Sequence, residues 1–369
     1  MRTHIAIVGS GIVGSAAAYR LCRMGLAVTV IDRPAGGGQA TAAGAGIVCP
    51  WVDHEGDDAW YRLVRESARG YPELVAELAE DGEDDCGYAS TGALLTADDP
   101  AELEGVTALL GRRRPGAPEM GDISPVDDPG AEFPPLAGGL AAVRVGGAAR
   151  VDGRAFRDAL LRAAARRGAA LRTGTARLGG AERVALDING EPIGADAVIV
   201  AAGAWTADLC EPLGHRLAVY PQRGQIVHAR LPGVDTSGWP IVLPRSGPYL
   251  LGFPGSRIVF GATREDAGFD GRATVGGLSG LLAAGLAVAP GLADATVLET
   301  RVGFRPVTGD GRPMIGLLAP GVVVATGLGA YGLTAGPLTG IAAAHFALGQ
   351  DPGTDLSPFS PLRPAPHGE

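Results

Sequence analysis

Lysine is absent from this sequence, and every one of its 31 basic residues is an arginine. Without a lysine the chain cannot form the Schiff base that many enzymes use on carbonyl compounds, so this chemistry is excluded. Cysteine is scarce as well: Cys22, Cys49, Cys86 and Cys210 lie far apart and form no CxxC pair. This spacing argues against a zinc site or a disulfide framework and favours a reducing compartment.

Long apolar runs are also missing. No stretch is long enough to span a bilayer, and the opening residues MRTHIAIVGSG lack the apolar core of a signal peptide. We therefore expect a cytoplasmic protein without a transmembrane segment. The net charge of -9 argues against nucleic acid as a partner, because phosphate binding needs a basic face.

The composition is that of a folded protein, with 46% hydrophobic and 19% charged residues, and 369 residues suffice for about two domains. Residues 4–31 predict a strand, a helix (15–24) and a second strand, and a sheet of such units is covered on both faces. The strand, turn and helix pattern returns at 196–205 and 321–347. Elsewhere the sequence predicts helices at 57–81, 100–110, 154–167 and 278–288, a strand at 87–96, and short antiparallel strands between 217 and 260.

A glycine motif joins the first strand to the first helix. Gly9 allows a tight turn, Gly11 lets a diphosphate approach the backbone, and Gly14 lets helix and strand pack closely. The helix N-terminus would then face the phosphates. Asp32 ends the second strand at the distance expected of a ribose-hydroxyl acceptor, so the motif predicts dinucleotide binding, with NAD and FAD both open.

Six segments, in the order in which they occur along the chain, distinguish FAD from NAD. Together they resemble segments of the D-amino acid oxidase, glycine oxidase and sarcosine oxidase family of flavoproteins, and the resemblance covers nearly the whole chain. The segments are 41–47 (TAAGAGI), 201–205 (AAGAW), 221–225 (PQRGQ), 261–270 (GATREDAGFD), 303–316 (GFRP with DGRPMIG) and 325–334 (ATGLGAYGLT).

The resemblance implies FAD as the cofactor. The residues expected to bind it are Gly9, Gly11, Ile12, Val13, Gly14, Asp32, Arg33, Thr41, Ala42, Ala43, Gly44, Gly46, Ile47, Ala202, Gly203, Trp205, Arg305, Gly329, Ala330, Tyr331, Gly332, Leu333 and Thr334. Backbone amides in the last turn could stabilise negative charge on a reduced flavin, although such a turn serves a phosphate equally well.

For substrate and catalysis the resemblance points to Arg305, Tyr249, Tyr331 and Arg264. A guanidinium matches a carboxylate as a planar fork, so Arg305 is the expected anchor; the alternative is a pair with an internal acid. Tyr249 either donates to the substrate or packs on a sheet, and Arg264 either faces the substrate or lies on the surface. Tyr331 lies in the glycine turn, where it could close the pocket.

The sequence departs from the family at three places. Ala330 stands where glycine oxidases have an arginine, the lysine above the flavin of sarcosine oxidases is absent, and no cysteine near Gly316 is available for a covalent flavin. We therefore expect non-covalent FAD and leave the electron acceptor open between oxygen and a quinone or another carrier. No general base is evident. His54 and His215 are the histidines to inspect, and Cys49 is expected to be a buried small residue.

The predicted fold class is α/β: a Rossmann-like FAD-binding domain of the glutathione-reductase type, made of 1–80, 145–219 and 301–369, with an antiparallel-sheet substrate domain made of 81–144 and 220–300. The predicted reaction is hydride transfer from a small amino acid (a D-amino acid, glycine or an N-methyl amino acid) to flavin N5, giving an imine that hydrolyses to an oxo acid. The rivals are a 2-hydroxy acid or polyol-phosphate dehydrogenase on the same fold and a flavin-binding subunit without turnover.

Overall fold

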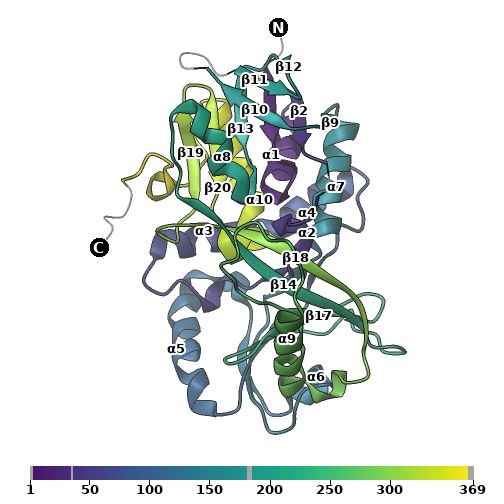
Figure 1. The fold of residues 1–369 in the computed structure, drawn as a ribbon. Helices are drawn as coiled ribbons and strands as arrows, with labels where there is room; N and C mark the ends of the chain where they lie inside the picture. The colour runs from purple at the N-terminus through teal and green to yellow at the C-terminus, as the bar shows by residue number, and fades with distance from the viewer. Residues whose placement is uncertain (1–2, 35, 181–184, 365–369) are drawn as a thin grey trace.

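The chain folds around two large sheets that are stacked end to end (Figure 1). The computed structural model describes residues 3–34, 36–180 and 185–364. A six-stranded sheet forms the upper part of the view and an eight-stranded sheet the lower part. The first strand and the last long helix both lie in the upper part, and the chain passes from the upper part to the lower part and back twice between them.

The upper sheet is parallel except at one edge. Its strands are, in spatial order, β19 (Met314–Ala319), β20 (Val322–Thr326), β13 (Ala197–Val200), β1 (His4–Val8), β2 (Ala27–Asp32) and β9 (Ala170–Thr173). Only β19 runs antiparallel to its neighbour, β20. This is the sheet of three separated segments that the strand, turn and helix patterns predict.

Both faces of this sheet are covered. Ile5 and Ile7 of β1 pack in one core with helices α1 (Ile12–Arg23), α7 (Gly153–Arg166) and α10 (Gly332–Ala347). The alternate residues of β1 face a second core. This core also contains residues of helix α8 (Thr206–Cys210) and of a small sheet formed by β10 (Ala176–Gly179), β11 (Ala185–Ile188) and β12 (Glu191–Ile193).

Helices α1 and α10 touch almost backbone to backbone. A Cβ at Gly340 would lie 2.3 Å from the carbonyl oxygen of Val13, and one at Gly336 would lie 2.6 Å from the side chain of Ile12. The first and last helices of the upper part therefore depend on each other for their close packing.

The lower sheet is mostly antiparallel. Its strands are β18 (Thr296–Thr308), β14 (Val219–Arg230), β17 (Arg257–Gly261), β16 (Tyr249–Phe253), β15 (Ile241–Pro244), β5 (Ala93–Ala97), β7 (Ala141–Val145) and β6 (Ile123–Val126). Only β15 and β5 pair in parallel. Strands β14 and β18 are the longest and lie where the two parts meet (Figure 1).

The remaining elements surround these sheets. They are α2 (Ala40–Ala43), α3 (Asp58–Arg69), α4 (Tyr71–Glu80), α5 (Glu104–Arg113), α6 (Pro129–Glu132), α9 (Val275–Val288) and the small sheet of β3 (Ile47–Val48), β8 (Ala149–Val151) and β4 (Tyr88–Ser90).

Two predicted elements are wrong in extent. The single helix predicted at 57–81 is two helices, α3 and α4, because Gly70 ends the first and Pro72, which has no amide hydrogen, lies in the first turn of the second. The strand predicted at 87–96 is divided between two sheets: β4 pairs with β8, and β5 pairs with β7 and β15. Gly92 makes the bend with φ of 75°.

The domain boundaries predicted above remain a proposal. Strands of the upper sheet fall in the three segments proposed for FAD, whereas β18 runs across the proposed boundary at residue 301. Within the described ranges, no helix is long and apolar enough to cross a membrane. The cytoplasmic location remains a prediction.

Candidate active site

One large cavity, of about 1240 Å³, lies between the two parts of the molecule. Four parallel strands of the upper sheet end beside it: Gly9 follows β1, Asp32 ends β2, Ala201 follows β13 and Thr326 ends β20. Carboxyl ends of parallel strands meet at one edge of a sheet, which is where open α/β folds bind ligands. The lower sheet supplies the opposite wall through Ile226, Tyr249, Gly261 and Arg305.

The glycine motif has the geometry that the sequence predicts. Gly9 adopts φ of 106°, and a Cβ there would lie 2.3 Å from the carbonyl oxygen of Ala201. A Cβ at Gly14 would lie 1.9 Å from the carbonyl oxygen of Gly9, so only glycine lets the first helix approach the first strand. The amide of Ile12 donates to Thr41 Oγ1 at 3.0 Å, which ties the start of α1 to the segment around α2.

Asp32 is held at the nucleotide end. Its carboxylate accepts hydrogen bonds from the amide of Ser10 (3.0 Å), the hydroxyl of Ser10 and the amide of Arg33 (2.9 Å). A carboxylate has about four acceptor positions, so one is left for a ribose hydroxyl. These residues fit the ADP half of FAD.

The last glycine-rich turn also faces the cavity, away from the nucleotide end at Asp32. The turn runs through the short 3-10 helix Gly329–Tyr331 into α10, and no side chain caps the first amides of α10. Thr334 donates its hydroxyl hydrogen to the carbonyl oxygen of Ile47 at 2.9 Å, which brings the 41–47 segment against the turn. Uncapped amides at a helix start favour negative charge, as the reduced flavin ring would carry.

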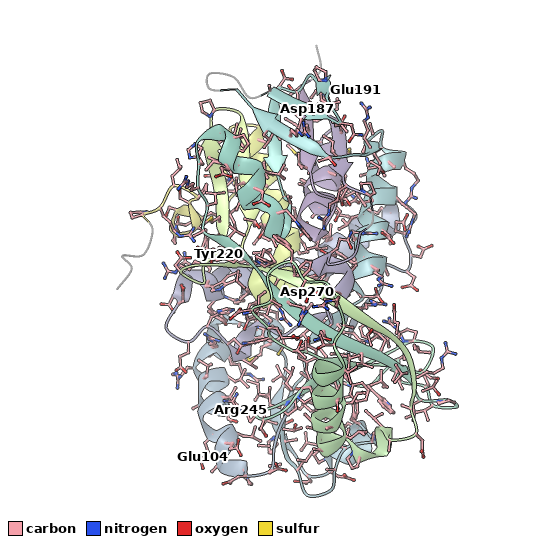
Figure 2. All side chains as sticks on the ribbon, viewed as in Figure 1. Glu104, Asp187, Glu191, Tyr220, Arg245 and Asp270 are labelled. Carbon is pink, nitrogen blue, oxygen red and sulfur yellow. The ribbon has the colours of Figure 1, made fainter. Side chains whose placement is uncertain are left out.

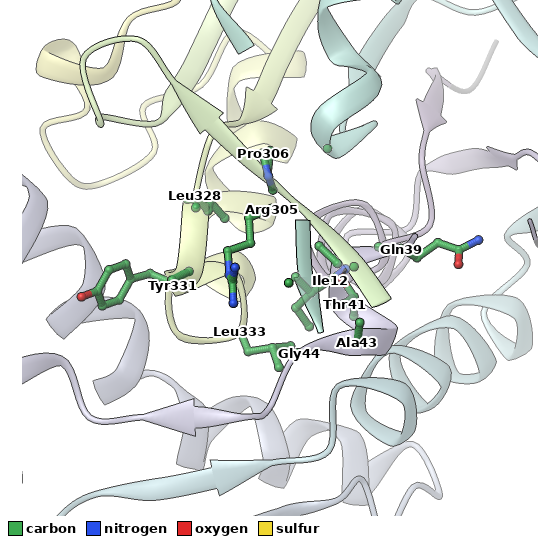
Figure 3. A pocket seen from close by; sticks show the side chains of 18 of the residues that line it. Ile12, Gln39, Thr41, Ala43, Gly44, Arg305, Pro306, Leu328, Tyr331 and Leu333 are labelled. Carbon is green, nitrogen blue, oxygen red and sulfur yellow. Dashed lines mark hydrogen bonds between the residues drawn. The ribbon is translucent and has the colours of Figure 1, made fainter. Parts of the chain in front are cut away.

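Arg305 projects into the cavity from β18 (Figure 3). It donates to the carbonyl oxygen of Thr263 at 3.0 Å and is hydrogen-bonded to Tyr249. Burial, together with the positive charge of Arg264, lowers the pKa of Arg305. Among the residues that the structure describes, no carboxylate lies within ion-pair distance of Arg305, so the alternative of a pair with an internal acid is wrong.

The other predicted substrate residues lie at the same end. Tyr249 is half-buried on β16, and burial raises the pKa of its hydroxyl, which therefore stays protonated. Arg264 is exposed and lines the cavity. Tyr331 also lines it, but its hydroxyl is bonded to Asp53 and turns away from Arg305 (Figure 3). Burial, and to a lesser extent the charge of Asp53, raises the pKa of the Tyr331 hydroxyl above its ordinary value.

The two histidines do not reach the cavity. His54 packs against Tyr331 and Trp60, with ring centroids 4.2 and 4.9 Å apart, and burial lowers its pKa. His215 lies outside the residues that line the cavity. Cys49 is buried, as expected, and burial raises the pKa of its thiol to about 12, so it is a neutral group beside the cavity.

Nearly all the residues expected to bind FAD line this one cavity. The exceptions are Gly14, whose role is packing, and Ala42, whose carbonyl oxygen accepts from Arg301 at 3.1 Å. Trp205 lines the wall with the guanidinium of Arg33 stacked 3.5 Å above its ring. The structure brings together residues that span positions 9 to 334.

Residues 174–178, which line the cavity near Asp32, and Arg245 were not predicted from the sequence. Residues 174–178 line the cavity because β9 pairs in parallel with β2, so its carboxyl end falls at the edge occupied by Asp32. Recognising 170–173 as a strand would have found them. Arg245 also lines the cavity, from the turn after β15. In the described ranges, no group of three or more acidic, histidine or cysteine side chains could hold a metal ion.

Comparison with known proteins gives one consistent result. A family model described as FAD dependent oxidoreductase (DAO) matches residues 4–346. An uncharacterized oxidoreductase, YurR, of Bacillus subtilis (strain 168) is 45% identical over 98% of this chain and 99% of its own length. The glycine oxidase of Geobacillus kaustophilus (strain HTA426) is 30% identical over 98% of this chain and 97% of its own length. The crystal structure of iminodiacetate oxidase from Chelativorans sp. BNC1 has a TM-score of 0.94 and 45% identity, covering 97% of this chain and 98% of that one.

Proposed function

Because the chain belongs to the DAO family of FAD-dependent oxidoreductases, we propose that it oxidises a small amino acid at the carbon beside the nitrogen. Membership confirms the family, the fold class and FAD as the cofactor that the sequence predicts. The particular substrate, the non-covalent attachment of FAD and the roles of single residues are part of the proposal.

The observation that carries the proposal is the position of Arg305. A largely buried guanidinium without an anionic partner is costly, and a bidentate carboxylate offsets that cost. Tyr249 is bonded to Arg305, and its protonated hydroxyl is a donor to the same carboxylate. Holding the carboxylate fixes the direction in which the neighbouring C–H bond points, so orientation is the main contribution of these side chains.

When bound, FAD would supply the redox chemistry as the acceptor of a hydride, that is, of a hydrogen together with the two electrons of its C–H bond. The substrate would lose this hydride from the carbon beside the nitrogen, and the nitrogen lone pair would form the C=N bond. Water would then hydrolyse the C=N bond to an oxo acid and ammonia or an amine. Burial raises the pKa of Tyr249 and of Tyr331, so both hydroxyls are protonated near neutral pH and can donate hydrogen bonds. The nitrogen lone pair is needed for the C=N bond, so the substrate reacts as the neutral amine.

The names of two relatives reduce the range of substrates to be considered. A glycine oxidase and an iminodiacetate oxidase both take their names from a substrate with a carboxylated CH2 group next to nitrogen. We propose the same arrangement here, with glycine or an N-substituted glycine as the substrate. Oxygen, a quinone or another carrier can each serve as electron acceptor within this proposal.

The test is anaerobic reduction of the bound flavin, followed by loss of the oxidised flavin absorbance, with glycine, iminodiacetate, N-methyl amino acids, D- and L-amino acids and 2-hydroxy acids. The proposal expects reduction by at least one amine, and Arg305→Leu should weaken its apparent affinity about 100-fold or more. Reduction by 2-hydroxy acids alone, without release of an amine or ammonia, would support the dehydrogenase rival. No reduction by any of these acids would support the non-catalytic rival.

A further inference from the structure

Residues 39–47, called the 39–47 segment below, lie between the nucleotide end of the cavity and the last glycine-rich turn. At one end Thr41 accepts a hydrogen bond from the amide of Ile12 at 3.0 Å, and at the other the carbonyl oxygen of Ile47 accepts from Thr334 at 2.9 Å. Every residue of the segment except Ala42 lines the cavity. A bound FAD that reaches from one end of the cavity to the other would therefore run along this segment.

Strand β18 of the lower sheet touches the 39–47 segment directly. Gly303 approaches it so closely that a Cβ there would lie 2.7 Å from the Cβ of Ala43 and 3.3 Å from the Cα of Ala40. Next to this contact, the amide of Phe304 donates to the carbonyl oxygen of Gly38 at 2.9 Å. The strand and the start of the segment are therefore packed almost backbone to backbone.

Arg301 attaches the same strand to the segment at a second point. Its side chain is only 9% exposed, and Nη1 donates to the carbonyl oxygen of Ala42 at 3.1 Å. Nε and Nη2 both donate to Glu299, at 2.9 and 2.6 Å, which orients the guanidinium on its own strand. Ala42 lies in the last turn of α2, where carbonyl groups lack partners within the helix and a cation is favoured. Among the described residues, Arg301 is the one side chain of the lower sheet that is hydrogen-bonded to the segment.

The strand that holds the segment also carries the proposed substrate anchor. Arg301, Gly303 and Arg305 alternate along β18 and so project from the same face. The pairing of β18 with β14 is regular from Thr300 to Thr308, and Tyr220, which pairs with this stretch, lies where the upper and lower parts meet (Figure 2). Four residues of strand place the first arginine about 13 Å from the second, measured along the backbone. One regular strand therefore fixes the segment relative to the anchor.

We propose that Arg301 is a positioning residue for the oxidation: it ties the segment that lies along the cofactor to the strand that carries Arg305. It thereby sets the distance between the flavin ring and the C–H bond of the substrate. Such a distance matters, because a displacement of about 1 Å can change a rate about 100-fold. The inference goes beyond the proposed function, since it concerns how the cofactor is held in place, whichever substrate is oxidised.

The first test measures FAD binding without turnover. Arg301→Met keeps an unbranched side chain but has no hydrogen-bond donor. The apoprotein of each variant is titrated with FAD, and the visible circular dichroism of the bound flavin is recorded. In Arg301→Met the dissociation constant of FAD should rise about tenfold, as loss of a hydrogen bond from a charged donor predicts. The circular dichroism should also change, because the surroundings of the flavin ring shift.

The second test uses anaerobic reduction of the flavin by an amine, and this test rests on the proposed function. In Arg301→Met the reduction rate constant at saturating substrate should fall about 10- to 100-fold. The apparent dissociation constant of the substrate should change less than about threefold, because Thr263 and Tyr249 still hold Arg305. An unchanged rate constant, or a substrate dissociation constant that rises by the same factor as the rate falls, would contradict the inference.

Arg154→Met is the matched control. Arg154 also donates to Glu299, at 3.5 Å, but it is exposed and lies outside the cavity. Its replacement removes the same charge and should leave the FAD dissociation constant and the reduction rate constant within about twofold of the wild type. Arg301→Lys has one nitrogen in place of the guanidinium fork, so both constants should lie between those of the wild type and of Arg301→Met.

The outcomes for the inference and for the proposed function are separate. If Arg301→Met binds FAD as tightly as the wild type with an unchanged circular dichroism, the inference is wrong. The same holds if Arg154→Met changes both as much, since the pairing with Glu299 then explains the effect. If Arg301→Met does not fold, wild-type FAD binding and circular dichroism in Arg301→Lys would overturn the inference. If no amine reduces the flavin, the proposed function fails, and the FAD titration and circular dichroism still decide the inference.

Discussion

Gly224 lies on β14 against the guanidinium of Arg305, so its replacement by alanine tests how closely that guanidinium must be placed. A Cβ at Gly224 would lie 2.7 Å from both terminal nitrogens of Arg305 and 2.8 Å from its central carbon. That is about 0.7 Å inside ordinary van der Waals contact. Arg305 cannot simply turn aside, because Thr263 and Tyr249 hold it. The alanine must therefore displace the guanidinium or break one of these hydrogen bonds.

The expected effect falls on the substrate rather than on FAD. A displacement of about 1 Å can cost about 100-fold in a well-oriented reaction, and loss of one hydrogen bond to a charged group costs about 1.5–3 kcal/mol. For Gly224→Ala we expect the apparent dissociation constant of the substrate to rise about 10- to 100-fold. The FAD content should change much less than the substrate affinity, since the nucleotide end of the cavity is not touched. Crowding of this kind costs about 1–3 kcal/mol of folding stability.

The assay is anaerobic flavin reduction over a range of substrate concentrations, with thermal unfolding measured on the same samples. Gly179→Ala is the matched control, because Gly179 also lies on a strand, outside the cavity, and its Cβ would meet nothing within 4 Å. If Gly224→Ala binds the substrate as well as the wild type, the close placement of the Arg305 guanidinium does not determine substrate affinity, and our argument from the position of Arg305 is refuted.

Three other predictions concern the rest of the molecule. Asp32→Ala should weaken FAD binding about tenfold or more, because a charge-assisted hydrogen bond to the ribose is lost; titration of the apoprotein with FAD measures this. Hydrogen bonds from Arg162 and Arg166 hold the pKa of Glu83 below its ordinary value, so Glu83→Gln should destabilise the fold by about 1–3 kcal/mol above pH 5. The difference should shrink as the pH falls through the lowered pKa, since the wild type then loses the same charge; equal unfolding temperatures at neutral pH would contradict this. Cys49, with its pKa raised to about 12, should resist alkylation by iodoacetamide in the folded protein at pH 8, and fast modification detected by mass spectrometry would contradict its burial.

Local signals made the FAD end of the molecule predictable. The first strand, helix and strand could be predicted from short-range periodicity and from Gly9 and Gly14, where any larger residue would collide with a backbone carbonyl. The GFRP motif at 303–306 was enough to identify Arg305 as a candidate site residue from the sequence. The structure adds why it is held in place, through Gly224 and Thr263, and this depends on the register between β14 and β18.

The errors and omissions have a common physical origin. The bend at Gly92 and the helix break at Gly70 are single-residue events inside stretches whose apolar pattern continues across them. The wall at 174–178 and the arrangement of Arg264 depend on contacts between residues far apart in sequence. No periodicity within one segment records such contacts.

The close packing of α1 against α10 also bears on how the chain folds as it is synthesised. The apolar face of α1 forms with the first thirty residues of the chain, but its partner helix begins only at Gly332. Until α10 leaves the ribosome, that face and the adjoining surface of the sheet remain without their cover. Nascent chains of this protein therefore expose apolar surface for nearly the whole of translation, and chaperones that hold such surfaces should bind them until the last helix docks.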